Sequence, residues 1–123
     1  MKKAVLDTNF ILSCVRNKID FFYDIKFMGL KIVIPTEVIE EIEKIVESKK
    51  KMKFREDAEL ALAVLKKNSF EKISLNVRHV DKGLIDWAND DKDVVVATLD
   101  REIKKKIKNP KLIIRNKKKL EII

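Results

Sequence analysis

The chain has 123 residues, of which 46% are hydrophobic and 39% charged, and its formal net charge is +8 at pH 7. This composition excludes a disordered chain, and the length suffices for one domain with its own core, expected to span residues 1–123. No apolar run reaches the about 20 residues that a membrane span needs, so no membrane association is expected.

The basic charge favours a polyanionic partner such as nucleic acid. The alternative is a heat-adapted, thermophilic surface, since Lys and Glu are abundant, Gly is scarce and Gln is absent. The start, MKKAVLDTNFIL, is interpreted as a strand rather than a signal sequence, because Asp7 and Asn9 interrupt it. With Cys14 as the single cysteine, a cytoplasmic location is expected.

Strand-like apolar runs alternate with helical patterns along the chain. The predicted elements are, in order, a strand at 3–7, helices at 9–17 and 20–28, a strand at 31–35, helices at 36–48 and 54–67, a strand at 72–76, a helix at 81–89, a strand at 93–98, a helix at 101–108 and strands at 111–115 and 120–123. Continuous apolar runs such as DVVVAT are typical of strands buried on both faces. We therefore predict an α/β fold, a three-layer α/β/α sandwich with a mainly parallel central sheet.

Two acids follow predicted strands directly. Asp7 closes the first strand, and Asp100 lies two residues past DVVVAT. Ligands of open α/β sheets bind beyond the carboxyl ends of the strands, so both side chains are expected at the same edge. Carboxylates gathered there would repel one another unless a divalent cation lay between them.

Two further acids lie at the inner border of predicted helices. On the helix 36–48, Glu41 borders the apolar stripe, and Glu37 lies one turn earlier on the same flank as a secondary candidate. Asp81 begins the helix 81–89 on its inward side, and the remaining acids are expected to be solvated. Each acid also has a purely structural interpretation, as a helix N-cap for Asp7, Asp81 and Asp100 or a lysine partner for Glu41.

These residues resemble the motifs of the PIN-domain nucleases along essentially the whole chain. The matching segments are VLDTNFIL with Asp7, the helix from Pro35 with Glu41 six residues later, VDKGLI with Asp81, and VATLDREI with Asp100. The closing IIRNKKKLEII also resembles an archaeal branch related to ribosomal-RNA-processing PIN nucleases, and VapC-type toxins are more distant. Two positions depart from the pattern, because Lys82 stands where many relatives have a second Asp and Leu99 where many have Asn or Arg.

The resemblance implies a ribonuclease that needs one or two Mg²⁺ or Mn²⁺ ions, with single-stranded or structured RNA as substrate. Asp7 and Asp100 are the expected direct ligands, and Glu41 and Asp81 bind a second ion or accept protons. Residues expected to orient these carboxylates or add charge are Thr8, Asn9, Thr98, Glu37 and Glu102. Residues expected to contact the RNA backbone are Lys82, Arg101, Lys104, Lys105, Lys117 and Lys118, for which a solvated surface is the alternative.

The partner and the biological setting stay open at this point. A toxin would bind an antitoxin, and a processing nuclease would meet ribosome-assembly proteins. The aromatic helix IDFFYDIKF is compatible with a homodimer contact and with a core. Aromatic residues, including Phe27 and Trp87, are expected in the core or at such a contact, and His79 is interpreted as a loop residue without a catalytic role.

Two other functions compete with this interpretation. A catalytically weak RNA-binding or ribosome-assembly protein on the same fold is favoured by Lys82. A phosphotransfer enzyme that uses Asp7 as nucleophile is disfavoured, because Asn9 stands where haloacid-dehalogenase-like enzymes need a second Asp.

Overall fold

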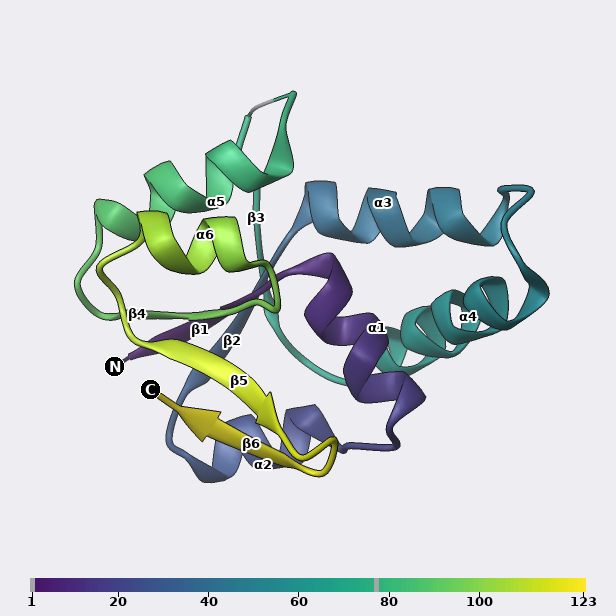
Figure 1. The fold of residues 1–123 in the computed structure, drawn as a ribbon, viewed down its shortest axis with the longest axis horizontal. Helices are drawn as coiled ribbons and strands as arrows, with labels where there is room; N and C mark the ends of the chain where they lie inside the picture. Colours follow the sequence, from purple (N-terminus) through teal and green to yellow (C-terminus); the bar gives the residue numbers. More distant parts are fainter. Residues whose placement is uncertain (1, 77) are drawn as a thin grey trace.

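The computed structural model describes residues 2–76 and 78–123 of the chain (Figure 1). Strands and helices alternate along most of its length. The elements are β1 (Lys3–Leu6), α1 (Thr8–Arg16), α2 (Phe21–Phe27), β2 (Lys31–Pro35), α3 (Thr36–Val46), α4 (Met52–Lys66), β3 (Glu71–Ile73), α5 (Val80–Asn89), β4 (Val94–Ala97), α6 (Arg101–Lys106), β5 (Lys111–Arg115) and β6 (Lys119–Ile122).

The described strands form one six-stranded sheet in the order β3-β2-β1-β4-β5-β6. All neighbouring pairs are parallel except β5 and β6, which form an antiparallel hairpin. The central strands β1 and β4 pair from Lys3↔Val94 to Leu6↔Ala97, so their carboxyl ends are level. This arrangement confirms the predicted α/β fold with a mainly parallel sheet.

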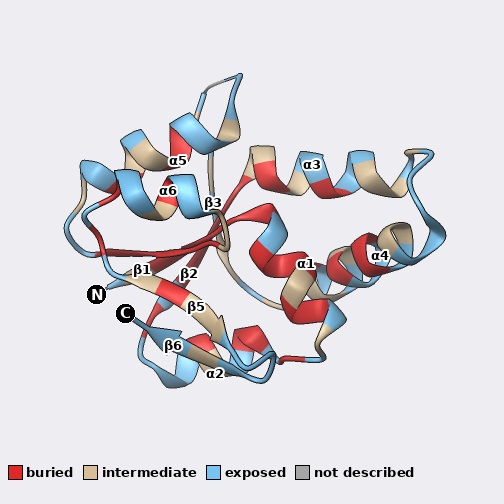
Figure 2. Ribbon diagram, viewed as in Figure 1, coloured by how far each residue is buried: buried red, intermediate tan, exposed pale blue. Residues whose placement is uncertain are grey.

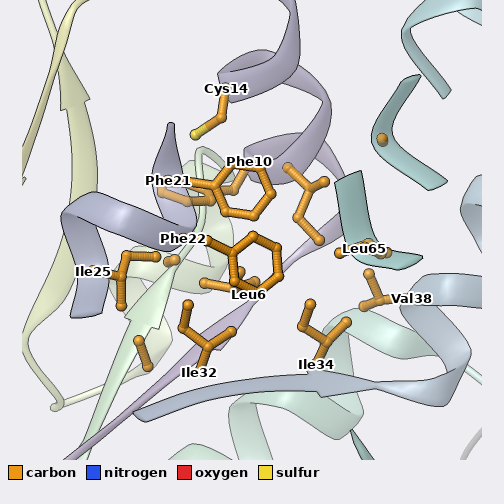
Figure 3. Packing of buried hydrophobic residues seen from close by; sticks show 14 of the residues in the cluster. Leu6, Phe10, Cys14, Phe21, Phe22, Ile25, Ile32, Ile34, Val38 and Leu65 are labelled. Carbon is orange, nitrogen blue, oxygen red and sulfur yellow. The ribbon is translucent and has the colours of Figure 1, made fainter. Parts of the chain in front are cut away.

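Helices cover both faces of the sheet, as the continuous apolar strands require. On one face Ala4 and Leu6 join a core with side chains of α1, α2, α3 and α4, in which Phe10, Phe21 and Phe22 are fully buried (Figures 2 and 3). Val5 points to the opposite face and packs with residues of α5 and α6. Successive strand residues alternate between faces, so the same short strand supplies both cores. The result is the predicted three-layer sandwich.

Local sequence signals set the ends of several elements. The Asp20 carboxylate accepts a hydrogen bond from the Tyr23 N–H at 3.2 Å and caps α2. Gly29 follows α2 with φ +80°, a conformation that side chains rarely adopt, and so lets the chain turn into β2. Pro35 ends β2 and is the N-cap residue of α3, which fixes where the helix carrying Glu41 begins.

Three predicted boundaries were wrong in ways that concern the site. The helix α5 begins at Val80 with His79 as N-cap residue, so Asp81 lies inside the first turn and does not cap it. The strand expected at 72–76 is β3, which ends at Ile73, and the Leu75 and Asn76 N–H groups donate to the Glu37 carboxylate instead of continuing the strand pairing. The last helix before β5 ends at Lys106 rather than 108.

The expectation that the remaining acids are solvated was wrong for Asp57. Its residue on α4 is 4% exposed, and its carboxylate accepts a hydrogen bond from Arg16 Nε of α1 at 3.0 Å. Lys53 Nζ lies 3.7 Å away, one turn earlier on the same helix. A buried carboxylate costs free energy unless it is paired, so this ion pair allows α1 and α4 to pack together.

The aromatic residues divide between core and surface. Phe10, Phe21 and Phe22 are buried, whereas Phe27 is 81% exposed and stacks on Tyr23 with ring centroids 6.2 Å apart. In the described part of the chain, no helix combines the length and the apolar character that crossing a membrane would take.

Arg16→Met tests the ion pair between α1 and α4. The substitution leaves Asp57 buried with a weaker partner, and we expect the free energy of unfolding to fall by about 1–2 kcal/mol, less than for a fully buried pair because the Arg16 side chain is 47% exposed. Urea unfolding at pH 7 measures it. The control Lys53→Met, whose side chain is 73% exposed, should change stability by less than about 0.5 kcal/mol. Equal losses in both variants would contradict this account.

Candidate active site

The carboxyl ends of β1 and β4 form the floor of the site. The Asp7 N–H donates to the Ala97 carbonyl at 3.0 Å, which continues the strand pairing by one residue. Directly after the strands the chain turns into α1 and α6. The first turns of α3, α5 and α6 face the same region beside the end of β1 (Figure 1).

Asp7 is the buried acid of the site, with 5% of the residue exposed. Its Oδ1 accepts a hydrogen bond from the Thr8 N–H at 2.8 Å, and its Oδ2 accepts one from the Thr98 hydroxyl at 3.0 Å. Both threonines are themselves buried. These contacts fix the orientation of the Asp7 carboxylate, and each oxygen keeps a lone pair for a further ligand.

Thr98 connects Asp7 to Asp100. Its hydroxyl oxygen donates to Asp7 and accepts the Asp100 N–H at 3.1 Å. Asp100 is also the N-cap of α6, where its Oδ1 accepts the N–H groups of Glu102 at 2.8 Å and Ile103 at 3.4 Å. The capping interpretation of Asp100 is thus correct, and the cap engages only Oδ1, so Oδ2 can serve a ligand.

Glu41 reaches the site from α3. Its Oε1 accepts a hydrogen bond from the Thr8 hydroxyl at 2.8 Å, across 33 positions of sequence. Thr8 therefore contacts two acids, Asp7 through its N–H and Glu41 through its hydroxyl. The Glu41 residue is exposed, so it lies at the rim rather than on the floor.

The charges of these acids interact. The pKa of Asp7 is raised from 3.8 to about 6, chiefly by burial and to a smaller extent by the negative charges of Asp81 and Glu41, while its hydrogen bonds from Thr8 and Thr98 act in the opposite direction. Partial burial and the charge of Asp100 raise the pKa of Asp81. Each of the four acids thus acts on another through space, although they come from four separate segments.

The acids are close neighbours without forming a tight cage. Within residues 2–76 and 78–123, no three Asp, Glu, His or Cys side chains are grouped closely enough to hold a metal ion as they stand. Asp7 and Asp100 are nevertheless tied to the same hydroxyl of Thr98.

The other acids and polar residues expected at the site lie as follows. Asn9 is exposed on α1 beside a cavity of about 340 Å³ that Asp100 also lines. Glu102 is exposed in the first turn of α6. Glu37 accepts hydrogen bonds from the N–H groups of Leu75 at 3.1 Å and Asn76 at 3.2 Å, so its carboxylate is engaged by the segment after β3.

The basic residues expected to contact RNA are at the surface. Lys82, Arg101, Lys105, Lys117 and Lys118 are exposed, and Lys104 is half-buried. Leu112 of β5 is level with Ala97, the last residue of β4, so β5 continues past the carboxyl edge. The turn carrying Lys117 and Lys118 therefore projects beyond the same edge of the sheet as the acids.

The chain belongs to the PIN-like domain family, since residues 4–117 match the sequence profile described as "PIN like domain". The resemblance seen in the four acidic motifs is thereby confirmed. This family membership covers all four candidate acids.

Two similar proteins carry nuclease names. Ribonuclease VapC4 of Methanocaldococcus jannaschii is 31% identical over 128 residues, which cover 99% of this chain and 97% of that protein. The solved structure titled "Structure of the PIN domain endonuclease Utp24" aligns with a TM-score of 0.77 and 26% identity over 98% of this chain and 90% of that one. These likenesses support a nuclease function for the family member described here.

Asp7→Asn should stabilise the metal-free protein at neutral pH. The folded state keeps the Asp7 proton up to about pH 6, whereas the unfolded chain releases it near pH 3.8. Between these two pH values the unfolded chain therefore binds fewer protons, and the free energy of unfolding falls as pH rises. A pKa change of this size corresponds to roughly 3 kcal/mol, of which we expect Asn to recover about 1–2 kcal/mol.

Urea unfolding in EDTA at pH 7.5 and pH 4.5 measures this difference. The gain of Asp7→Asn over the wild type should be large at pH 7.5 and small at pH 4.5. Asp86→Asn, at an exposed acid of α5, is the control and should show no such difference. A pH-independent effect of Asp7→Asn would contradict the assigned pKa.

Proposed function

We propose that the protein is a Mg²⁺- or Mn²⁺-dependent endoribonuclease that hydrolyses phosphodiester bonds of single-stranded or structured RNA. The observation that carries the proposal is the buried Asp7 carboxylate, which lies within the electrostatic influence of Glu41 and Asp81. Such a site is unfavourable when every acid is ionised, and a bound cation removes the penalty. The nuclease names of similar proteins agree with it.

The donor set fits a hard divalent cation. All four acids offer carboxylate oxygens, which Mg²⁺ and Mn²⁺ prefer. Asp7 and Asp100 are the proposed ligands, because the hydroxyl of Thr98 contacts both residues. When bound, one or two such ions would supply the Lewis acidity and positive charge that phosphodiester hydrolysis needs.

Glu41 and Asp81 are the proposed proton acceptors or further ligands. Oε1 of Glu41 is held by the Thr8 hydroxyl, which leaves Oε2 to take a proton from the attacking water. The raised pKa of Asp81 suits the same task, because a stronger base accepts a proton more readily near neutral pH. Thr8 and Thr98 keep the acids oriented, and Lys82, Arg101 and the lysines of α6 and of the β5–β6 turn would bind the RNA backbone.

The chemistry of the site is the same in a toxin and in a processing enzyme, so the substrate and the partner distinguish the two biological settings. A toxin-type enzyme would bind a small antitoxin, whereas a processing enzyme would associate with ribosome-assembly proteins. Both would act in the cytoplasm on RNA with the same acids. Copurification from the native cell, followed by identification of the bound protein, separates the two settings.

Divalent cations should stabilise the protein only when Asp7 is present. At tenfold excess over its dissociation constant, a cation that binds only the folded state adds about 1.4 kcal/mol, or about 4 °C in Tm. Differential scanning fluorimetry with Mn²⁺ and Mg²⁺ measures the shift, with Ca²⁺ as a third ion. Asp7→Asn should abolish it, and Glu43→Gln, at an exposed acid of α3, should preserve it. An equal shift in Asp7→Asn would contradict metal binding at this site.

Mn²⁺ should support cleavage of a labelled single-stranded RNA, and Asp7→Asn or Asp100→Asn should lower the rate at least about hundredfold, because each removes a charged oxygen ligand. Gel analysis of the products with and without EDTA measures the rate. Glu43→Gln is the matched control and should cleave like the wild type. Cleavage that survives both EDTA and Asp7→Asn would contradict the proposal.

The alternative is a catalytically weak RNA-binding or ribosome-assembly protein, and the observation that favours it is Lys82. This exposed cation follows Asp81 where many relatives carry an acid. If Lys82 has suppressed catalysis, the wild type will bind RNA without cutting it and Lys82→Asp will restore cleavage. Activity in the wild type would rule this alternative out.

A further inference from the structure

A groove opens from the candidate active site along α3. It has a volume of about 460 Å³, and its lining includes Glu41 and Asp81 together with Lys44, Arg78 and His79. Glu41 and Asp81 belong to the proposed catalytic set, so a chain that occupies the groove would contact two of the four proposed acids. Lys44 lies three residues after Glu41 on α3, and side chains at this spacing lie on the same helix face.

One wall of the groove is held in place by Glu37. Its carboxylate accepts hydrogen bonds from the Leu75 and Asn76 N–H groups and from the Ser74 hydroxyl at 3.1 Å. Desolvation acts to raise the pKa of Glu37, but these donors together outweigh it and leave the pKa below its ordinary value. Asn76 has φ 52°, so this turn is a defined conformation that the carboxylate stabilises. Arg78 lines the groove together with Lys44, and it shares this lining with Glu37 and Glu41 of α3.

The cations of the groove are available to an external anion. Lys44 and Arg78 are both exposed, and neither takes part in the ion pairs found among residues 2–76 and 78–123. Glu37 is engaged by backbone N–H groups and Glu41 by Thr8, so these neighbouring acids have other partners. Arg presents a planar fork that matches a phosphate, and Lys adds a point charge.

We infer that this groove binds the RNA strand beside the scissile bond, with Lys44 and Arg78 as phosphate contacts. The inference rests on the proposed nuclease function and adds the path of the substrate on the α3 side of the acids. The groove also contains Glu37, Glu40, Glu41 and Asp81, so its acids outnumber its cations. RNA therefore binds there only when a divalent cation offsets the carboxylates, whereas the lysines of α6 and of the β5–β6 turn attract RNA without one.

The test measures RNA affinity separately from cleavage. Fluorescence anisotropy with a labelled single-stranded RNA in Ca²⁺ gives the Kd, and a gel confirms that the RNA stays intact. The variant Lys44→Ala/Arg78→Ala is compared with Lys2→Ala/Lys92→Ala, which removes the same charge from exposed positions beside the amino ends of β1 and β4. Thermal unfolding of both variants confirms that they fold.

We expect the groove variant to raise Kd about tenfold or more in Ca²⁺ and the control to change it less than about twofold. Loss of two phosphate contacts should also reduce the slope of log K against log salt by about 1.4. In EDTA both variants should bind RNA alike. Equal weakening by both variants in Ca²⁺, unchanged Kd in the groove variant, or no RNA binding by the wild type would overturn the inference.

The same experiment separates this inference from the nuclease proposal. If the wild type fails to cleave RNA in Mn²⁺ while the groove variant alone loses affinity, the groove is confirmed and the nuclease proposal fails. If cleavage depends on Asp7 while the groove variant keeps its Kd and its KM, the nuclease proposal holds and the groove is not the path of the RNA.

Discussion

The burial of one ionisable carboxylate, that of Asp7, is the constraint on which the site depends. Parallel pairing of β1 with β4 places this side chain where the two strands end, below the surface and next to Thr98. Two hydrogen bonds hold it, yet burial still raises its pKa to about 6. An apolar or amide side chain at this position would avoid the free-energy cost of burying a charge. The divalent cation that we propose would offset this cost and so explain why a carboxylate stands there.

Two threonines connect Asp7 to other acids of the site by hydrogen bonds. Thr98 contacts Asp7 and Asp100, which closes the floor, and Thr8 contacts Asp7 and Glu41, which connects the floor to the rim. Each threonine lies at the start of the segment that follows a strand, so its position is set by the sheet rather than by a flexible loop. Asp81 interacts with Asp7 and Asp100 through its charge. The site therefore combines two acids at the strand ends with two exposed acids on helices.

Much of this arrangement could be predicted from the sequence, because it depends on strand ends and helix faces. Uninterrupted apolar runs indicate strands buried on both sides, and parallel order then brings Asp7 and Asp100 to one edge. The misjudged acids depend on contacts between segments far apart in the chain. Asp57 has the spacing of a helix surface residue, and only the packing of α1 on α4 buries it beside Arg16. Nothing local indicates that Glu37 binds backbone N–H groups 38 positions away.

The central claim is that Asp7 carries an unfavourable negative charge which a divalent cation relieves. Carbon-13 NMR titration of the Asp7 carboxyl group, first in EDTA and then with Mg²⁺, tests it most directly. We expect an apparent pKa of about 6 without metal and a clear fall when Mg²⁺ is added. An ordinary pKa near 3.8 in EDTA, unchanged by the ion, would contradict the claim.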